Sequence, residues 1–138
     1  MDVFSKRKCS RIMARIGGKN TGPEVAVRRF LHSKGFRYRL HGAELPGKPD
    51  IVLPKYRAVV FVHGCFWHGH RGCRKGRTLP ATRKAFWRRK IEGNRKRDRR
   101  DRRRLRRTGW RVFVVWACQI KNAHTLKRLA GDLRRRGG

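Results

Sequence analysis

The chain has 138 residues, 38% of them hydrophobic, which suits one domain with a core of its own. Its formal net charge is +32, from 40 lysine and arginine residues against 8 aspartate and glutamate residues. This charge indicates a polyanionic partner, because a compact fold that carries it repels itself, although any single arginine can equally reflect genome composition. We find no apolar run of about 20 residues and no export signal, which disfavours a membrane as that partner. We therefore expect a cytoplasmic protein.

A basic, glycine-containing segment, residues 1–20, is expected to form an arm ahead of a single domain at residues 21–138. The domain opens with a helix-start signal, because Thr21 can act as the cap, a proline follows in the first turn, and Glu24 stands three residues after the cap. Gly35 is a suitable C-terminal stop for this helix. Its apolar face consists of Val27, Phe30 and Leu31.

Three short strands are predicted next, because their residues alternate in polarity or are β-branched. They lie at Phe36–Leu40, Asp50–Leu53 and Ala58–Val62, and residues 54–57 read as a hairpin turn between the last two. Residues 63–82 are rich in glycine, histidine, cysteine and arginine and follow neither a helical nor a strand period. Something other than a hydrophobic core must therefore order this loop.

A long basic helix is predicted at residues 83–107, followed by a buried strand at 111–117 and a last amphipathic helix. One narrow stripe of the long helix is apolar and includes two carboxylates; it consists of Trp87, Ile91, Asn94, Asp98, Asp101 and Leu105. The apolar face of the last helix consists of Leu126, Leu129 and Leu133. The order of elements predicts an α/β fold in which helices flank a mixed sheet.

The cysteines have two open interpretations in a reducing compartment: metal ligands, or small buried hydrophobic side chains. Cys65, His70 and Cys73 follow the pattern Cys-x4-His-x2-Cys, which can supply three of the four ligands of zinc. Cys118 follows the strand at 111–117, where it could supply the fourth ligand and pin the loop to the sheet. The glycine, arginine and histidine around these residues do not build an apolar pocket, which slightly favours zinc.

Several carboxylates and histidines near this loop are candidates for catalysis. Asp50 stands where a turn meets a strand, and its oxygens suit magnesium, although a turn aspartate without function is the commoner case. His63 and His68 are left over after the zinc assignment and could act as general base or acid. Asp98 faces inward on the stripe, where a functional role and a salt bridge are equally supported. Glu24 either joins this site or only caps its helix.

Aromatic residues in a cationic, glycine-containing loop have little core to join. Phe66 and Trp67 are therefore candidates for wedging between nucleic-acid bases. For Phe86, at the start of the long helix, packing on the sheet is the better interpretation.

Three long segments resemble the bacterial very-short-patch-repair (Vsr) mismatch endonucleases: LPGKPDIVLPKYRAVVFVHGCFWHGH, PATRKAFWRRKIEGN and RDRRDRRRLRRTGWRVFVVWAC. The similarity runs from about Ser10 to Cys118. It implies a restriction-endonuclease-like fold and magnesium-dependent nicking of one DNA strand, 5′ to the T of a T:G mismatch. Such mismatches arise when 5-methylcytosine deaminates, and the family's preferred context is CC(A/T)GG. It further implies a monomer acting at the bacterial nucleoid, possible contact with a MutL-type repair protein, and no membrane partner.

The resemblance also assigns roles position by position. Asp50 resembles the magnesium-binding carboxylate, with the backbone carbonyl of Val62 as a further ligand, and His68 resembles the catalytic histidine that activates water. Residues that support the phosphate, water and metal are His63, Asp98 and Glu24. The implied ligands of a structural zinc ion are Cys65, His70, Cys73 and Cys118. The implied DNA contacts are the wedge of Phe66 and Trp67, Met13 from the other groove, and Trp87 near the same surface.

Two other functions remain open from the sequence. A non-catalytic zinc protein that binds nucleic acid would explain the charge and the cysteines, but it leaves Asp50, His68 and Asp98 unexplained. A restriction-like nickase of the same fold with another target would explain all of these residues. A magnesium-dependent cleavage assay excludes or supports the first, and matched T:G and T:A duplexes test the second.

Overall fold

The computed structural model describes residues 22–135; the expected N-terminal arm with Met13, the cap residue Thr21 and residues 136–138 lie outside them. The centre of the described part is a four-stranded sheet in the order β1-β2-β3-β4. β2 pairs antiparallel with both β1 and β3, whereas β3 and β4 are parallel. The strands are β1 (Arg39–Leu40), β2 (Ile51–Leu53), β3 (Ala58–His63) and β4 (Arg111–Trp116).

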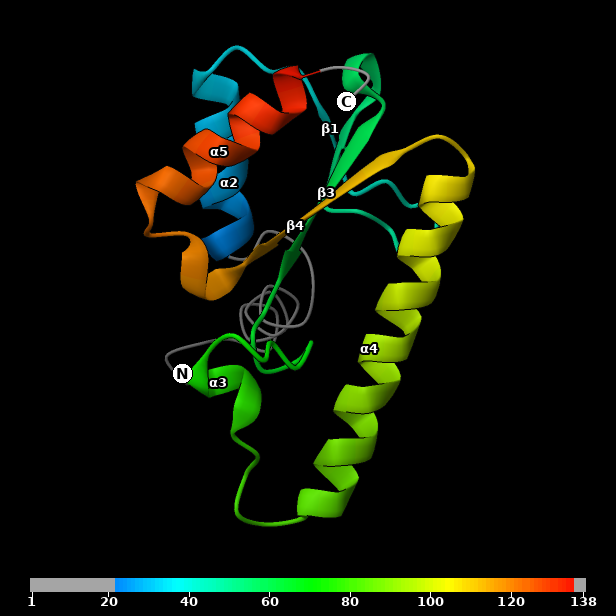
Figure 1. Cartoon of the computed structure of the whole chain (residues 1–138), viewed down its shortest axis with the longest axis vertical. Coiled ribbons are helices and arrows are strands. Elements are labelled where there is room, and N and C mark those ends of the chain that lie inside the picture. Colours follow the sequence, from blue (N-terminus) through cyan, green and yellow to red (C-terminus); the bar gives the residue numbers. More distant parts are fainter. Residues whose placement is uncertain (1–21, 136–138) are drawn as a thin grey trace, which may run out of the picture.

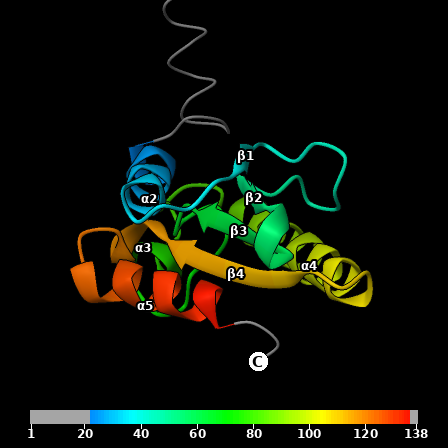
Figure 2. The same ribbon diagram turned by 90° about the horizontal axis from the view of Figure 1, so that it is seen from above.

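Helices cover both faces of this sheet (Figure 1 and Figure 2). Helices α2 (Gly22–Ser33) and α5 (Ala123–Arg134) lie on one face, and the long helix α4 (Lys84–Arg107) lies on the other. The remaining helical segments are short: η1 (Pro54–Tyr56), α3 (Arg74–Arg77) and η2 (Ala117–Gln119). The predicted mixed sheet flanked by helices is confirmed, and it is consistent with a restriction-endonuclease-like fold.

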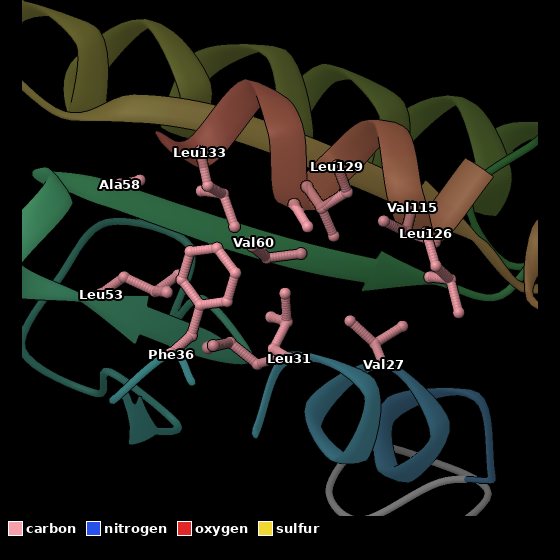
Figure 3. Close-up of a cluster of buried hydrophobic side chains, with 12 residues drawn as sticks. Val27, Leu31, Phe36, Leu53, Ala58, Val60, Val115, Leu126, Leu129 and Leu133 are labelled. Carbon is pink, nitrogen blue, oxygen red and sulfur yellow. The ribbon is translucent and has the colours of Figure 1, made fainter. Parts of the chain in front are cut away.

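The larger core cluster lies between the sheet and the pair α2 and α5 (Figure 3). Successive residues of β3 point to opposite faces, so Ala58 and Val60 join this cluster while Val59 and Phe61 face α4. The second cluster is smaller, and Leu105 is the residue that α4 buries in it. The predicted apolar faces are confirmed, because α2 contributes Val27 and Leu31 and α5 contributes Leu126, Leu129 and Leu133.

Two expectations about the strands are wrong. The predicted strand Phe36–Leu40 shortens to β1, because the Phe36 N–H donates to the Leu31 carbonyl at 3.1 Å to close the end of α2, and its ring enters the core. The strand at 111–117 is not buried throughout: of the six residues of β4, only Val115 is buried. β4 is an edge strand that pairs with β3 alone, which leaves one of its sides uncovered by the sheet.

The long helix agrees closely with its prediction, since α4 spans Lys84–Arg107 and its stripe faces inward. Ile91 and Leu105 are buried, and the other four stripe residues are partly buried. The predicted loop at 63–82 begins one residue later, because His63 ends β3, and it is irregular except for α3, a single helical turn that the sequence pattern did not predict. None of the helices in residues 22–135 has both the length and the hydropathy that a membrane span requires.

Candidate active site and metal cluster

The loop that follows β3 sends its side chains to two separate clusters. One is the thiol cluster, made of Cys65, His70, Cys73 and Cys118. The other is the imidazole cluster, made of His63, His68 and Asp98. Within each cluster, the atoms that could bind a metal ion all lie within 4.8 Å of one another. Residues 63–73 therefore alternate between two sites with different chemistry.

The thiol cluster has the donor set and the spacing of a tetrahedral metal site. Zinc bonds of about 2.3 Å to sulfur and about 2.0 Å to nitrogen place neighbouring ligand atoms about 3.5–3.8 Å apart. The Cys118 Sγ and His70 Nδ1 atoms are 3.5 Å apart. The four residues that the sequence grouped together are thus brought together by the fold, and they fit a zinc ion.

Backbone contacts hold the thiol cluster in place. The His70 N–H donates to the Cys65 carbonyl at 2.9 Å, and the His70 ring stacks on Trp116 at the end of β4. A side chain at Gly76 would bring its Cβ to 1.9 Å from the His70 carbonyl oxygen, so α3 packs directly on this backbone. Cys118, just beyond β4 in η2, therefore lies where a shared metal ion would tie the loop to the sheet.

The thiols shift one another's ionisation in opposite directions: hydrogen bonds, first from the Gly76 backbone and then from the Cys65 and Cys118 thiols, lower the pKa of Cys73. Desolvation and the adjacent thiols of Cys65 and Cys73 raise the pKa of Cys118 to about 11. A bound cation would reverse this effect, because a coordinating thiol loses its proton. The cluster thus has the geometry of a metal site, and a bound cation would favour ionisation of the Cys118 thiol in particular.

Asp50 is oriented by the backbone of the neighbouring strand. Its Oδ2 atom accepts the N–H of Val62 in β3 at 2.7 Å. The turn before Asp50 is pinned to α4 at Gly47, which has a φ of +75° and where an added Cβ would lie 2.9 Å from the Cβ of Asp101. Only glycine meets both requirements, so the turn holds the carboxylate close to α4.

The charges around Asp50 place it in one site with the other candidates. Burial raises the pKa of Asp50 to about 6, although the Val62 N–H favours the ionised form. The Glu24 carboxylate raises this pKa further, while His41 and His68 lower it. A buried carboxylate with a raised pKa is stabilised by a divalent cation, and its hard oxygen atoms suit magnesium.

His68 is the centre of the imidazole cluster. Its Nδ1 atom lies 2.7 Å from Oδ2 of Asp98, on the inward stripe of α4. The His63 ring stacks on the His68 ring with a centroid distance of 3.8 Å and an interplanar angle of 4°. Because a carboxylate can only accept, Nδ1 of His68 carries the proton in this pair and Nε2 keeps its lone pair when the ring is neutral.

The two partners of His68 differ in charge: His63 is neutral and Asp98 is ionised. Burial lowers the pKa of His63 to about 3, and the adjacent His68 lowers it further, so this ring is neutral near pH 7. Its buried Nδ1 atom has no hydrogen-bond partner among residues 22–135. Burial acts to raise the pKa of Asp98, but the hydrogen bond and charge of His68 outweigh it and leave this pKa below the usual value.

Glu24 forms a pair that the sequence did not suggest. Its side chain is 1% exposed, and its Oε1 atom lies 2.7 Å from Nε2 of His41. The His41 backbone N–H donates to the Asp50 carbonyl at 2.9 Å, which brings this pair beside β2. Glu24 therefore does more than cap α2, since it joins the first helix to the turn that carries Asp50.

The aromatic residues of the loop cluster at the start of α4. The rings of Phe66, Trp67 and Trp87 contact one another edge to face, with centroids 5.4–5.8 Å apart. Trp67 remains 40% exposed, and its carbonyl accepts a hydrogen bond from Asn94. The expectation that Phe86 packs on the sheet is wrong: its ring lies edge-on to Trp87 with the Arg83 guanidinium over it. A side chain at the first turn of α4 cannot reach the sheet, because the sheet meets this helix near its other end.

The fold thus brings the predicted residues together, apart from Met13, which lies outside the described residues. Their catalytic and DNA-binding roles stay predictions. Two contributors were missed: His41, which pairs with Glu24, and Trp116, which packs on His63, His68 and His70. The sequence offered one signal for Trp116, because this residue lies near the end of a predicted strand and two residues before Cys118. His41 gave none, because its partner is 17 residues away in the chain.

Comparisons with known proteins agree with this geometry. The family described as "DNA mismatch endonuclease Vsr" matches residues 1–75. The type II nicking enzyme V.XorIIP of Xanthomonas oryzae is 52% identical over 91% of both chains. The type II nicking enzyme V.NmeAIP of Neisseria meningitidis is 49% identical over 88% of this chain and 85% of its own. The DNA mismatch endonuclease Vsr of Escherichia coli is 43% identical over 91% of this chain and 79% of its own. The chain therefore belongs to the Vsr DNA mismatch endonuclease family.

Proposed function

We propose that this protein is a magnesium-dependent DNA endonuclease that nicks one strand 5′ to the T of a T:G mismatch. The observation that carries the proposal is the pairing of His68 with Asp98, both partly buried, in the neighbourhood of Asp50. Relatives named as mismatch endonucleases and nicking enzymes support single-strand cleavage of DNA as the reaction class. A non-catalytic zinc protein would have no use for this arrangement.

Asp50 is the residue that we propose to hold the magnesium ion, with the Val62 carbonyl as a second oxygen donor. The ion supplies charge neutralisation at the scissile phosphate. The Val62 N–H fixes one carboxylate oxygen, so Asp50 presents its charge in one orientation before any ligand binds. Glu24, held by His41, adds a second carboxylate to the same region and supports the water around the ion.

His68 is the proposed general base. Asp98 accepts at Nδ1, which orients the ring and leaves Nε2 free to take a proton from the attacking water. His63 stays neutral against the other face of this ring, so it does not repel the imidazolium that His68 becomes. Its Nδ1 atom is buried without a hydrogen-bond partner in residues 22–135, so this ring acts on the site through its stacking on His68.

The wedge of Phe66 and Trp67 is the proposed source of mismatch selectivity. Trp67 is exposed yet backed by Trp87 and held at its carbonyl by Asn94, so it can enter a base stack without rearranging the loop. Unstacking a base step costs a few kcal/mol, and it costs less at a poorly paired step. Trp67→Ala should therefore reduce the preference for a T:G duplex over a T:A duplex by about tenfold.

Zinc in the thiol cluster has a structural role in this proposal, because it orders the loop that carries both His68 and Trp67. A protein that nicks one strand needs only one active site, which supports a monomer. A MutL-type protein stays a possible partner.

The test is a nicking assay on duplexes labelled separately on each strand, with a T:G or a T:A pair at one position. We expect cleavage of the T strand of the T:G duplex alone, dependent on magnesium. Asp50→Asn should bind this duplex without cutting it, and Glu44→Gln, which removes an exposed surface carboxylate, should cut normally. Equal cleavage of both duplexes would refute mismatch selectivity, and cleavage by Asp50→Asn would refute the metal role.

A further inference from the structure

An open pocket lined by four arginines lies beside the proposed DNA wedge. The pocket has a volume of about 390 Å³ and is lined by residues of the loop after β3, α3 and the N-terminal half of α4. Its lining includes four arginines, Arg71, Arg77, Arg88 and Arg95, and one acidic residue, Glu92. None of the four guanidiniums forms an ion pair within residues 22–135. The pocket therefore gathers positive charge that the described fold does not neutralise.

Tight packing of the backbone fixes the walls of this pocket. At Gly69, with a φ of +60°, an added Cβ would lie 2.7 Å from Ile91 and 2.9 Å from Arg95, so the loop packs tightly on α4. At Gly76, the backbone of α3 packs on that of His70. The thiol cluster fixes the same loop from its other side. The arginines are thus held around the pocket by backbone that has little freedom to move.

The positive charges in and around the pocket repel one another. Desolvation lowers the pKa of Arg95, and the charges of Arg71 and Arg99 lower it further, while Glu92 only partly compensates. An oxyanion between these guanidiniums would relieve this repulsion, and arginine forks match the geometry of a phosphate.

The location of the pocket beside the wedge indicates which phosphate of the DNA it would bind. Arg88 follows Trp87, whose ring contacts Trp67, and Gly69 stands two residues after Trp67. We infer that the pocket formed by Arg71, Arg77, Arg88 and Arg95 binds one backbone phosphodiester of the duplex next to the wedge. This inference rests on the proposed function for its ligand. A free phosphate ion has the same chemistry, so the test separates the two sources.

The experiment measures affinity for the T:G duplex without magnesium, while each phosphodiester in turn is replaced by an uncharged methylphosphonate. For wild type, one linkage near the mismatch should weaken binding by about tenfold, the loss expected from charge-assisted hydrogen bonds. For Arg77→Gln/Arg88→Gln, the same replacement should cost no more than about twofold, because the partner of that phosphate is gone. The control Arg103→Gln/Arg104→Gln removes two exposed arginines near the other end of α4 and should keep the wild-type profile.

A variant that binds the duplex more tightly provides a second readout, because a misfolded protein would bind it more weakly. Glu92→Gln removes the one carboxylate of the pocket and should tighten binding by about two- to threefold, with the gain lost when the same linkage is uncharged. Identical linkage profiles for wild type and Arg77→Gln/Arg88→Gln would overturn the inference. Binding of inorganic phosphate alone, unaffected by the duplex, would also overturn it and assign the pocket to a free ion. If wild type nicks the T:G duplex but shows no coupled linkage, only this inference fails. If wild type does not nick that duplex, the proposed function fails.

Discussion

The thiol cluster and the imidazole cluster share one loop but differ in what holds them together. In the imidazole cluster and around Asp50, polar groups already satisfy one another: His68 with Asp98, and Asp50 with Val62. The thiol cluster has longer internal contacts, such as the 3.5 Å between Cys118 Sγ and His70 Nδ1, and burial and the adjacent thiols raise the pKa of Cys118. The first arrangement is organised by hydrogen bonds before a ligand arrives, and we propose that the second depends on a metal ion for its order.

This difference assigns separate tasks to two neighbouring sites. A site that performs proton transfer gains from side chains oriented in advance, since they cost no reorganisation during the reaction. A site that only ties a loop to a sheet needs strong bonds and no open position. Changes at Asp50 or in the imidazole cluster should therefore spare the thiol cluster, whereas loss of the thiol cluster should disable both tasks, because the same loop carries His68.

The broadest effect is expected from losing the thiol cluster, because it should remove both the order of the loop and the activity. Cys73→Ser/Cys118→Ser should lose its zinc and retain less than about 1% of the nicking rate, because structural zinc contributes folding free energy. Metal analysis, nicking rate and amide exchange of residues 63–73 check this. Cys9→Ser is the matched control, since we do not assign Cys9 to the cluster, and it should keep both zinc and activity. A zinc-free double variant with normal activity would contradict the ordering role.

Asp50→Asn should abolish nicking and yet leave the fold intact. The pKa of Asp50 rises from 3.8 to about 6 on folding, so the folded state favours the protonated carboxyl and wild type loses stability as the pH rises through this range. Asparagine is always neutral. Without divalent cations, the variant should therefore equal wild type near pH 3.5 and exceed it by at most about 3 kcal/mol above pH 7. Chemical denaturation at the two pH values measures this difference, and lower stability of the variant at pH 7.5 would contradict the burial of Asp50.

Much of this comparison could be predicted from the sequence, because its signals are local. The spacing of Cys65, His70 and Cys73 indicated the thiol cluster, and the period of α4 turned Asp98 inward. Two features depend on contacts between distant segments and gave no local signal. They are the pair of His41 with Glu24 and the edge position of β4.

Asp98→Asn should reduce the rate of nicking by about a hundredfold and leave zinc content and duplex affinity unchanged. The amide can donate to Nδ1 of His68, which would favour the tautomer with its proton on Nε2 and so remove the base. Single-turnover rates on the T:G duplex measure the effect. Asp132→Asn, a change to a carboxylate on α5, is the control and should act as wild type. A rate unchanged by Asp98→Asn would remove the reason to call His68 the base.

The smallest effect is expected at His41, which acts through Glu24. His41→Ala should reduce the nicking rate by about tenfold, because it leaves a buried carboxylate without its imidazole partner. His41→Gln keeps an N–H donor at a similar reach and should restore most of the rate. His32→Ala, at an exposed position of α2, provides the comparison. If His41→Gln is as impaired as His41→Ala, the hydrogen bond to Glu24 is not what matters.

The most direct test adds zinc and magnesium separately to metal-free protein, because the account gives zinc the ordering of the loop and magnesium the cleavage of the strand. The measurement is the single-turnover nicking rate of a T:G duplex with zinc alone, magnesium alone, or both. Zinc alone should give an ordered loop and tight DNA binding but no cut strand, and only the two metals together should give full activity. Full activity with magnesium in protein shown to be free of zinc, or with zinc when magnesium is absent, would contradict the account.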